Sequence, residues 1–389
     1  MTNSSQKIPF WSDPSKRSIA FQLLALIAIS SFGYYLYRNA QFNLAKQNIA
    51  TGFGFLNLEA GFDIADSPIE YWSDDPYWKA LVVGVLNTFK VAFIGNFFAI
   101  LFGTVMGIVL LSKNWLASKL AKSYVEVVRN IPLLLQLFFW YAIFADIFPG
   151  VRDALNPIGN IFVSQRGIVF PVFAEHPVWK YVWIAIFASS IISYYIRKSI
   201  LKRREETGKT VNYWIPVLLT MIILPLITWA IGGAPTEVTS PEMGGFNFRG
   251  GYTISPELVA LMIGLIVYTS AFIAEIVRAG ILSVSHGQWE ASESLGITKN
   301  QTMALVILPQ ALRVIIPPVT SQILNLTKNS SLAVAIGFAD FVSVANTTMN
   351  QTGQAIECVL LIMGVYLIFS LSTSLFMNWY NKKIALVER

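Results

Sequence analysis

The sequence is poor in the residues on which several common kinds of site depend. It contains a single cysteine, Cys358, so an internal disulfide framework or a cysteine metal site cannot form within the chain. Its two histidines, His176 and His286, are too few for a histidine metal cluster. Charged residues make up only 13% of the 389 residues, whereas a soluble domain carries about 25%. We therefore expect no metal site and no ordinary soluble domain.

Catalytic signatures are missing as well. The sequence has no H-E-x-x-H, no G-x-S-x-G and no dinucleotide-binding glycine fingerprint. Gly208-Lys209-Thr210 matches only the end of a P-loop, because the full pattern needs a glycine at the position of Arg203. We therefore expect no catalytic residue, no cofactor bound by this chain and no enzymatic activity. Energy for any active process would come from a partner or from an ion gradient.

Long apolar runs make up much of the chain. Hydrophobic residues account for 54% of it, and several runs reach the roughly 20 residues that cross a bilayer. This pattern predicts an all-α polytopic membrane protein with about eight transmembrane helices. The expected helices lie at 19–37, 79–112, 131–148, 179–196, 213–232, 257–279, 313–335 and 355–379.

The basic residues are distributed unevenly among the segments between these helices. Most of the 28 Lys and Arg residues lie near the two chain ends or in alternate loops, including 113–130 and 197–212. The positive-inside rule therefore places both termini and these loops in the cytoplasm. The net charge of +6 then needs no nucleic-acid partner. Residues 38–78 are acidic and aromatic, and we expect them to form an ordered extracytoplasmic segment against the membrane face.

One polar stretch, residues 285–309, is longer than a simple connection between two membrane helices. Ser285 with Gln288, and Thr298 with Gln301, have the spacing of capping boxes that begin two short helices. Gly296 suits the left-handed residue that ends the first of them. We expect this loop to present a binding surface.

Two other interpretations of the loop are open. A DNA-reading helix-turn-helix would need basic side chains for phosphates, whereas the loop carries Glu290 and Glu293 against Lys299. An amphipathic helix at the membrane surface, without a partner, is the second.

The residues of this loop favour recognition. The loop contains Glu290-Ala291-Ser292, followed by Gly296 and by Leu308-Pro309. This pattern resembles the EAA motif of ABC-transporter permeases, with Ser292 in place of the second alanine. The resemblance extends over about 79–145 and 257–380 and is most similar to permeases for polar and general L-amino acids. It implies that the loop is a coupling helix that docks on a cytoplasmic ATPase. The implied coupling residues are Gly287, Glu290, Ala291, Ser292, Gly296, Leu308 and Pro309.

The resemblance also implies a domain organisation. Residues 1–78 would form an N-terminal anchor helix and the extracytoplasmic segment, and 79–389 the permease domain, with a two-helix hairpin inserted at about 149–256. The family core would consist of five of the expected helices, at 79–112, 131–148, 257–279, 313–335 and 355–379.

The implied partners are those of an ABC importer in the bacterial inner membrane. They are a second permease subunit, identical or different, two copies of a cytoplasmic ABC ATPase that binds ATP and Mg²⁺, and an extracytoplasmic amino-acid-binding protein. The chain itself would form the path for an L-amino acid. An ion-driven secondary transporter is the alternative, but that class shows repeated halves with matching broken helices, and only one Pro-broken helix, at Pro317-Pro318, is evident.

A candidate substrate path follows that break. An amino acid carries two charges, so its path needs polar groups at mid-depth. The stretch 325–331 is the most polar within an apolar run, although its side chains could instead join neighbouring helices. Glu275 could pair with Arg278 at i+3 or with Lys328. The candidate path residues are Glu275, Asn325, Lys328, Asn329 and Ser330.

Overall fold

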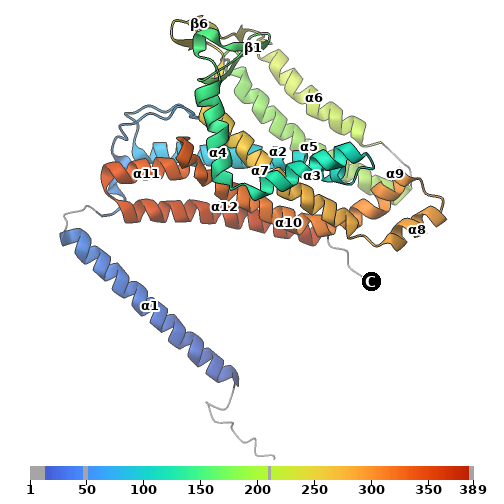
Figure 1. Cartoon of the computed structure of the whole chain (residues 1–389), viewed down its shortest axis with the longest axis horizontal. Helices are drawn as coiled ribbons and strands as arrows, with labels where there is room; N and C mark the ends of the chain where they lie inside the picture. The colour runs from blue at the N-terminus through green and yellow to red at the C-terminus, as the bar shows by residue number, and fades with distance from the viewer. Residues whose placement is uncertain (1–13, 47–50, 209–211, 385–389) are drawn as a thin grey trace, which may run out of the picture. The chain divides into compact units, whose positions relative to one another are not determined.

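The computed structural model describes residues 14–46, 51–208 and 212–384. The P-loop-like residues Lys209 and Thr210 and both chain ends, which we expect in the cytoplasm, lie outside these ranges. Helices dominate the described part (Figure 1). The chain divides into two compact units, one formed by Met1–Glu126 with Thr269–Arg389 and the other by Val127–Tyr268.

The first unit is helical. Its apolar helices are long enough to cross a membrane, and α2, α10, α11 and α12 pack on one another. Some of these helices end at a glycine in the left-handed conformation. Gly353, with a φ of 72°, ends α11 in this way. The helices are α1 Pro14–Lys46, α2 Tyr77–Leu110, α3 Trp115–Asn130, α8 His286–Ser294, α9 Lys299–Thr302, α10 Leu308–Asn329, α11 Phe341–Thr352 and α12 Ala355–Ile384, with α3 shared at its end with the second unit.

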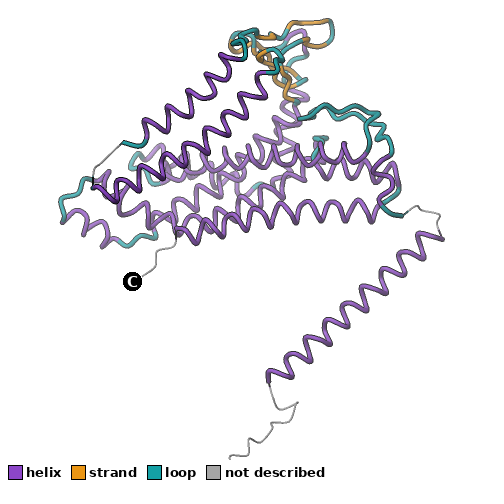
Figure 2. The backbone as a smooth tube through the Cα atoms, turned by 180° about the vertical axis from the view of Figure 1, so that it is seen from behind, coloured by secondary structure: helices purple, strands orange, loops and turns teal. Residues whose placement is uncertain are grey.

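The second unit contains a helical hairpin with a small β-structure at one end (Figure 2). Its helices are α4 Leu133–Ala142, which continues as a π-helical turn to Ile147, α5 Val178–Thr207, α6 Trp214–Ile231 and the first half of α7 Pro256–Leu282. The strands are β1 Leu155–Ile158, β2 Ile161–Ser164, β3 Gly167–Phe170, β4 Val172–Phe173, β5 Val238–Thr239, β6 Glu242–Gly244, β7 Asn247–Arg249 and β8 Tyr252–Ile254.

The strands add to the all-α expectation. The main sheet has the antiparallel order β1-β2-β3-β8, in which Val163 pairs with Ile168 and Val169 with Thr253. All eight strands among the described residues lie in 149–178 and 233–256, the segments left between the helices expected at 131–148, 179–196, 213–232 and 257–279. Four-residue strands are too short to show a clear alternation of apolar and polar positions.

The structure supports seven or eight membrane-crossing segments among the described residues. Seven single helices are long and apolar enough to cross a membrane. α3 and the helix Leu133–Ile147 meet at a bend of 104°, and together they would form an eighth segment. The predicted helix at 131–148 is therefore too short to cross alone. Its 15 residues from Leu133 span only about 22 Å of helix.

The predicted break at Pro317-Pro318 is wrong. α10 continues as an α-helix through both prolines, and the departure comes later, in a 3-10 stretch from Ser330 to Ile336 that Gly337 ends with a φ of 82°. A membrane helix tolerates proline where local adjustments and neighbours satisfy the freed backbone groups. Asn325 and Lys328 therefore lie on regular helix rather than on broken backbone.

Glycines allow α2 to approach α7 closely, as the small-residue spacing predicts. A Cβ added at Gly103 would lie 2.7 Å from Cβ of Ile273, and one at Gly107 would lie 2.7 Å from Cβ of Val277. Both distances are shorter than real Cβ contacts, so only glycine permits this packing.

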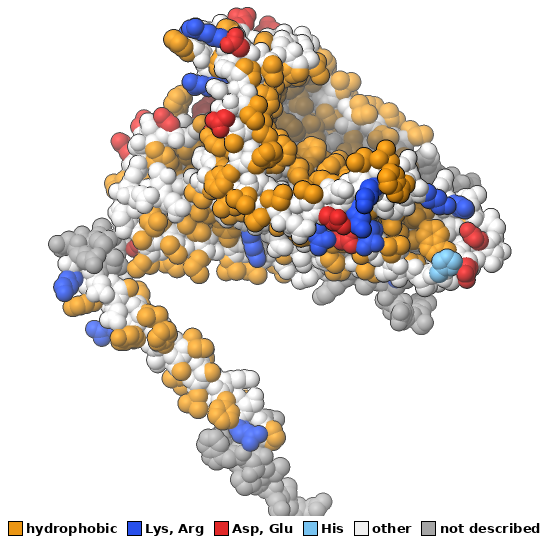
Figure 3. All heavy atoms as spheres, viewed as in Figure 1, with side chains coloured by type: hydrophobic (Ala, Val, Ile, Leu, Met, Phe, Trp, Pro, Cys, Tyr) orange, Lys and Arg blue, Asp and Glu red, His pale blue; other side chains and the backbone are white. Residues whose placement is uncertain are grey.

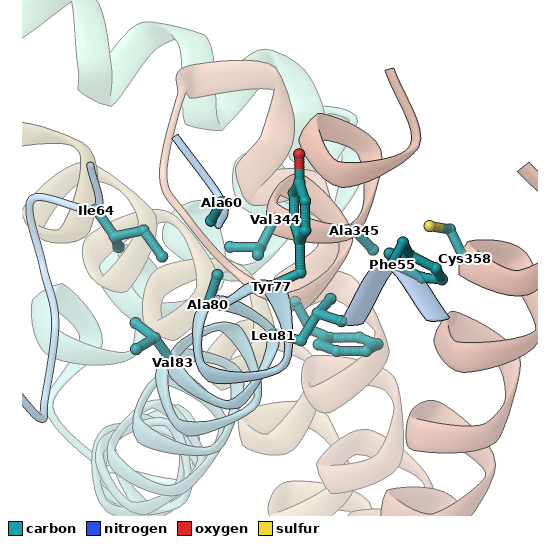
Figure 4. Packing of buried hydrophobic residues seen from close by; sticks show 11 residues of the cluster. Phe55, Ala60, Ile64, Tyr77, Ala80, Leu81, Val83, Val344, Ala345 and Cys358 are labelled. Carbon is teal, nitrogen blue, oxygen red and sulfur yellow. The ribbon is translucent and has the colours of Figure 1, made fainter. Parts of the chain in front are cut away.

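The acidic segment after α1 is folded onto the first unit. α1 extends to Lys46, so this segment begins later than predicted. Phe55 and Ala60 are buried with Tyr77 of α2, Val344 of α11 and Cys358 of α12 (Figure 4). The segment is also tied to the start of α12, because the Gly52 backbone N–H donates to Glu357 Oε1 at 2.6 Å. The prediction of an ordered segment is confirmed for residues 51–76.

Candidate functional site: a polar loop and a polar helix face

The loop between α7 and α10 folds as two short helices joined by a tight turn. α8 ends in a Schellman motif, in which Gly296 N–H donates to Glu293 O at 2.9 Å and Ile297 N–H donates to Ser292 O at 3.2 Å. Gly296 has a φ of 70°, the left-handed conformation that favours glycine. The predicted role of Gly296 in ending the first helix is confirmed.

Only one of the two predicted capping boxes forms. Thr298 and Gln301 make the reciprocal box at the start of α9, and the Thr298 N–H donates to Gln301 Oε1 at 3.2 Å. Ser285 begins α8 as predicted, but its side chain makes no capping hydrogen bond. The box at Ser285 and Gln288 is therefore wrong, and the reason is that Gln288 engages a different partner.

That partner is Gln310, in the first turns of α10. Its Nε2 donates to Gln288 Oε1 at 3.2 Å and to Val306 O at 2.9 Å. α10 itself starts at Leu308, with Pro309 in its first turn, where proline needs no hydrogen-bond partner. The side-chain bond joins α8 directly to a long helix of the first unit.

The loop exposes an acidic and apolar surface. Glu290 points outward, with a side-chain exposure of 69%, and its Oε1 lies 3.0 Å from His286 Nδ1. Leu295 and Leu305 are 77% and 69% exposed, unusual for leucines in a soluble loop. Figure 3 shows acidic and histidine side chains gathered beside apolar ones at this end of the first unit. Such a surface fits a protein partner with an apolar groove and basic groups.

The predicted coupling residues separate into two groups. Gly287, Glu290, Ala291, Gly296, Leu308 and Pro309 are exposed, and a Cβ at Gly287 would meet nothing within 4 Å. Ser292 is only 3% exposed, and its hydroxyl donates to Gln288 O at 2.8 Å. Ser292 therefore supports the fold of α8 from inside rather than presenting a contact.

Among the candidate path residues, Glu275 has a local partner. Arg278 donates to Glu275 through Nε at 3.0 Å and through Nη2 at 2.5 Å, the i+3 pair that the sequence allowed. A bidentate Arg–carboxylate pair is strong and specific. Glu275 is therefore paired within α7 itself, with no bond to Lys328 among the described residues.

The exposed polar residues of α10 lie on one face. Ser321, Asn325 and Lys328 follow one another at helical spacing, and all three are exposed. Asn329 is half-buried, whereas Ser330 is fully buried and its hydroxyl donates to Thr327 O at 2.8 Å. The face therefore consists of Ser321, Asn325 and Lys328, and Ser330 supports the end of the helix instead. Ser321 is a residue that the sequence analysis missed, although its spacing from Asn325 could have shown it.

A buried carboxylate also escaped the sequence analysis. Asp340 is fully buried and caps α11, because its Oδ1 accepts from the Ser343 N–H at 2.8 Å. Its Oδ2 accepts a hydrogen bond from the Tyr366 hydroxyl of α12 at 3.1 Å. An aspartate before Phe341 and a glycine at 353 are the signals that could have predicted α11.

Relatives among known proteins match nearly the whole length of this chain. A family profile described as the binding-protein-dependent transport system inner membrane component matches residues 210–386. The general L-amino acid transport system permease protein AapQ of Rhizobium johnstonii is 45% identical over 97% of this chain and 94% of its own length. The putative amino-acid ABC transporter permease protein YhdX of Escherichia coli is 45% identical over 97% of both chains.

The name of a third relative specifies four amino acids as substrates. The glutamate/glutamine/aspartate/asparagine transport system permease protein BztB of Rhodobacter capsulatus is 39% identical over 97% of this chain and 96% of its own length. Among solved structures, a crystal structure of an amino acid ABC transporter with histidines is similar over 79% of this chain and 95% of that chain, with 20% identity and a TM-score of 0.47.

Proposed function

Since the chain belongs to the family of inner membrane components of binding-protein-dependent transport systems, we propose that it is the permease subunit of an ATP-driven importer of L-amino acids. The observation that carries the proposal is the folded loop between α7 and α10, which exposes Glu290 beside apolar side chains. The names of the relatives, each of which spans nearly the whole chain, supply the substrate class. The ion-driven alternative finds no support among them.

The loop acts as a lever. α8 contacts the ATPase with Glu290, Ala291 and Gly287, and the Schellman turn at Gly296 keeps its direction fixed. Movement of α8 reaches α10 through the bond between Gln288 and Gln310. α10 then carries its polar face with it, so closure of the ATPase changes the path through the membrane. A change of this kind is a rigid-body switch driven by differential binding to two states.

The polar face of α10 forms part of the substrate path. Ser321, Asn325 and Lys328 are exposed on a helix whose other exposed residues are apolar, such as Val314 and Val334 of the following turn. Charged and amide groups at membrane depth face a cavity or a partner rather than lipid. The ammonium group of Lys328 would attract the substrate carboxylate, and Asn325 would donate or accept a hydrogen bond.

The assembly follows from the family. The chain works with an ATPase and a binding protein, and we infer two copies of the ATPase, which hold ATP and Mg²⁺, and a second permease subunit, identical or different. This chain binds no cofactor and performs no covalent chemistry. Both of its termini lie in the cytoplasm, on the side of the basic loops.

Reconstitution tests the proposal. The chain is purified with its ATPase and second permease subunit and placed in proteoliposomes, with the binding protein outside and ATP inside. Uptake of a labelled L-amino acid should require both ATP and the binding protein. Uptake by this chain alone, driven by a proton or sodium gradient without ATP, would establish the ion-driven alternative instead.

A further inference from the structure

Helix α3 has three different faces. Ala121 and Val125 form its buried face. Leu116, Leu120 and Val127 form an exposed apolar stripe, and Lys119, Lys122 and Glu126 form an exposed charged stripe beside it. Figure 3 shows charged side chains grouped at the surface over α3, with apolar side chains around them. The function proposed above uses none of these residues.

The helix runs beside membrane-crossing helices rather than across their ends. Near its start, the Ser118 hydroxyl donates to Leu110 O, at the end of α2, at 3.1 Å. Two turns later, Tyr124 contacts Phe102, with ring centroids 5.7 Å apart, and its hydroxyl lies 2.7 Å from Ser270 Oγ of α7. α3 therefore runs back along α2, in the opposite direction, and alongside α7.

These contacts place part of the charged stripe at membrane depth. Phe102 precedes the end of α2 by eight residues, or about 12 Å of helix. The exposed side chains of α2 remain apolar from Phe97 to Ile108, which is the pattern of a surface that faces acyl chains. Glu126, which follows Tyr124, therefore lies inside the apolar zone.

Charges at that depth need water or a partner. Lys122 Nζ lies 3.7 Å from Glu126 Oε1, and both side chains are more than half exposed, at 65% and 62%. An exposed pair cannot face hydrocarbon without a large desolvation cost. The apolar stripe beside it provides the lipid-facing surface, so the charged stripe faces elsewhere.

We propose that the Lys119, Lys122 and Glu126 stripe of α3 lines the water-filled, cytoplasmic part of the translocation path, where its lysines attract the carboxylate groups of amino acids. The proposal rests on the proposed transport function and adds a second polar surface to that of α10. The stripe carries two positive charges and one negative charge, so it favours anionic substrates over cationic ones.

An anionic lipid surface is the competing occupant of a lysine-rich amphipathic helix. A helix of that type lies in the plane of the membrane. The contacts of α3 with Leu110, Phe102 and Ser270 instead align it with helices that cross the membrane. We therefore favour the aqueous path, and the experiment distinguishes the two.

Cysteine accessibility tests the geometry. Cys358 is the only cysteine and is buried, so Cys358→Ser gives a background for single cysteines. Lys119→Cys and Lys122→Cys are compared with Leu116→Cys and Leu120→Cys, which replace residues that are 57% and 63% exposed on the same helix. The assembled complex in inside-out vesicles is treated with a membrane-impermeant thiosulfonate reagent, with and without a non-hydrolysable ATP analogue.

If the stripe lines the path, cysteines at positions 119 and 122 should react about tenfold faster than cysteines at 116 and 120. The ATP analogue should slow the reaction at 119 and 122, because the cytoplasmic side of the path closes. Equal and slow reaction at all four positions would overturn the proposal. Fast reaction at 119 and 122 that ignores the analogue but slows when anionic phospholipid is added would assign the stripe to the lipid surface instead.

Uptake tests the charge effect. In the assembled complex, Lys119→Glu with Lys122→Glu should lower uptake of glutamate about tenfold relative to uptake of arginine, the low end of the effect of a charged cleft on ion capture. Lys119→Gln with Lys122→Gln should give an intermediate ratio. An unchanged ratio in both variants would refute the attraction of carboxylates. If the parent complex takes up no amino acid, the proposed function fails, while the accessibility result still decides where the stripe lies.

Discussion

Gln310 of α10 donates a hydrogen bond to Gln288 of α8, and this bond is a direct side-chain link between the exposed loop and the helix that carries Lys328. We expect Gln310→Leu to weaken coupling, so that amino-acid uptake falls several-fold at an unchanged rate of ATP hydrolysis. The magnitude follows from the roughly 1 kcal/mol that a neutral hydrogen bond contributes. A double-mutant cycle with Gln288→Leu checks the mechanism. Fully additive effects of the two substitutions would show that the bond transmits nothing.

Packing of α2 on α7 depends on Gly103. A side chain there would lie 2.8 Å from Ser270 O and 2.7 Å from Cβ of Ile273, so Gly103→Val should overpack the contact and cost about 1–3 kcal/mol. Thermal unfolding of the purified protein in detergent measures the loss. Gly364→Val is the matched control, because nothing lies within 4 Å of a Cβ at that helix position. Equal melting temperatures for both variants would contradict the close approach.

Lys328 and Asn325 should affect transport without affecting the ATPase. Lys328→Met removes the charge that would attract the substrate carboxylate, and a hydrogen bond to a charged group contributes about 1.5–3 kcal/mol. We expect uptake to fall about tenfold or more, and Asn325→Leu to give a smaller loss. ATP hydrolysis by the assembled complex should persist in both. Leu367→Met, at an exposed apolar position of α12, is the control and should transport normally. Parent-level uptake by Lys328→Met would exclude this face from the path.

Asp340 should make stability depend on pH. It lies between the membrane-crossing segments Lys299–Ile336 and Ala355–Tyr380, and burial raises its pKa to about 6 from an ordinary 3.8, although the bonds from Ser343 and Tyr366 favour the charged form. The folded state therefore binds the proton more tightly than the unfolded state. Stability from this group is greatest below pH 4 and falls by roughly 3 kcal/mol as the pH rises through 6.

The melting temperature measured between pH 4 and pH 7 tests this dependence. Asp340→Asn keeps a capping oxygen for the Ser343 N–H but cannot ionise, so the fall in stability across that range should disappear. The same slope in the parent and in the variant would assign the pH dependence to other groups.

The sequence predicted most of the fold because the bilayer imposes strong rules on composition. Apolar runs located several membrane helices within a few residues, as at α2, predicted at 79–112 and found at Tyr77–Leu110, whereas α1 and α5 extend well past their predicted ends into polar sequence. The helix at Phe341–Thr352 was not predicted, because its 12 residues mix apolar and polar positions and only the four residues 337–340 separate it from the preceding apolar run. Its recognition depends on the caps Asp340 and Gly353 rather than on hydropathy.

The candidate sites show the limits of sequence reasoning in another way. Spacing identified the loop and the turn at Gly296, because left-handed backbone and helix caps are local features. Spacing could not show that Ser292 faces inward, or that Gln288 binds Gln310 instead of capping α8, because both depend on tertiary contacts. The same holds for α3. Its lysines were counted with a cytoplasmic loop, and only its contacts with Phe102 and Ser270 show that it runs along α2.

The central claim is that Glu290 and its loop couple ATP hydrolysis by a partner to movement of an amino acid through this chain. The measurement is the number of amino acids taken up per ATP hydrolysed in proteoliposomes that contain the assembled complex, for the parent and for Glu290→Lys. The side chain of Glu290 is exposed and the substitution leaves the turn at Gly296 intact, so the variant should insert and fold normally. We predict that the ratio falls at least about tenfold in Glu290→Lys, while Glu293→Lys, on the same helix, retains most of it. An unchanged ratio in Glu290→Lys would contradict the account.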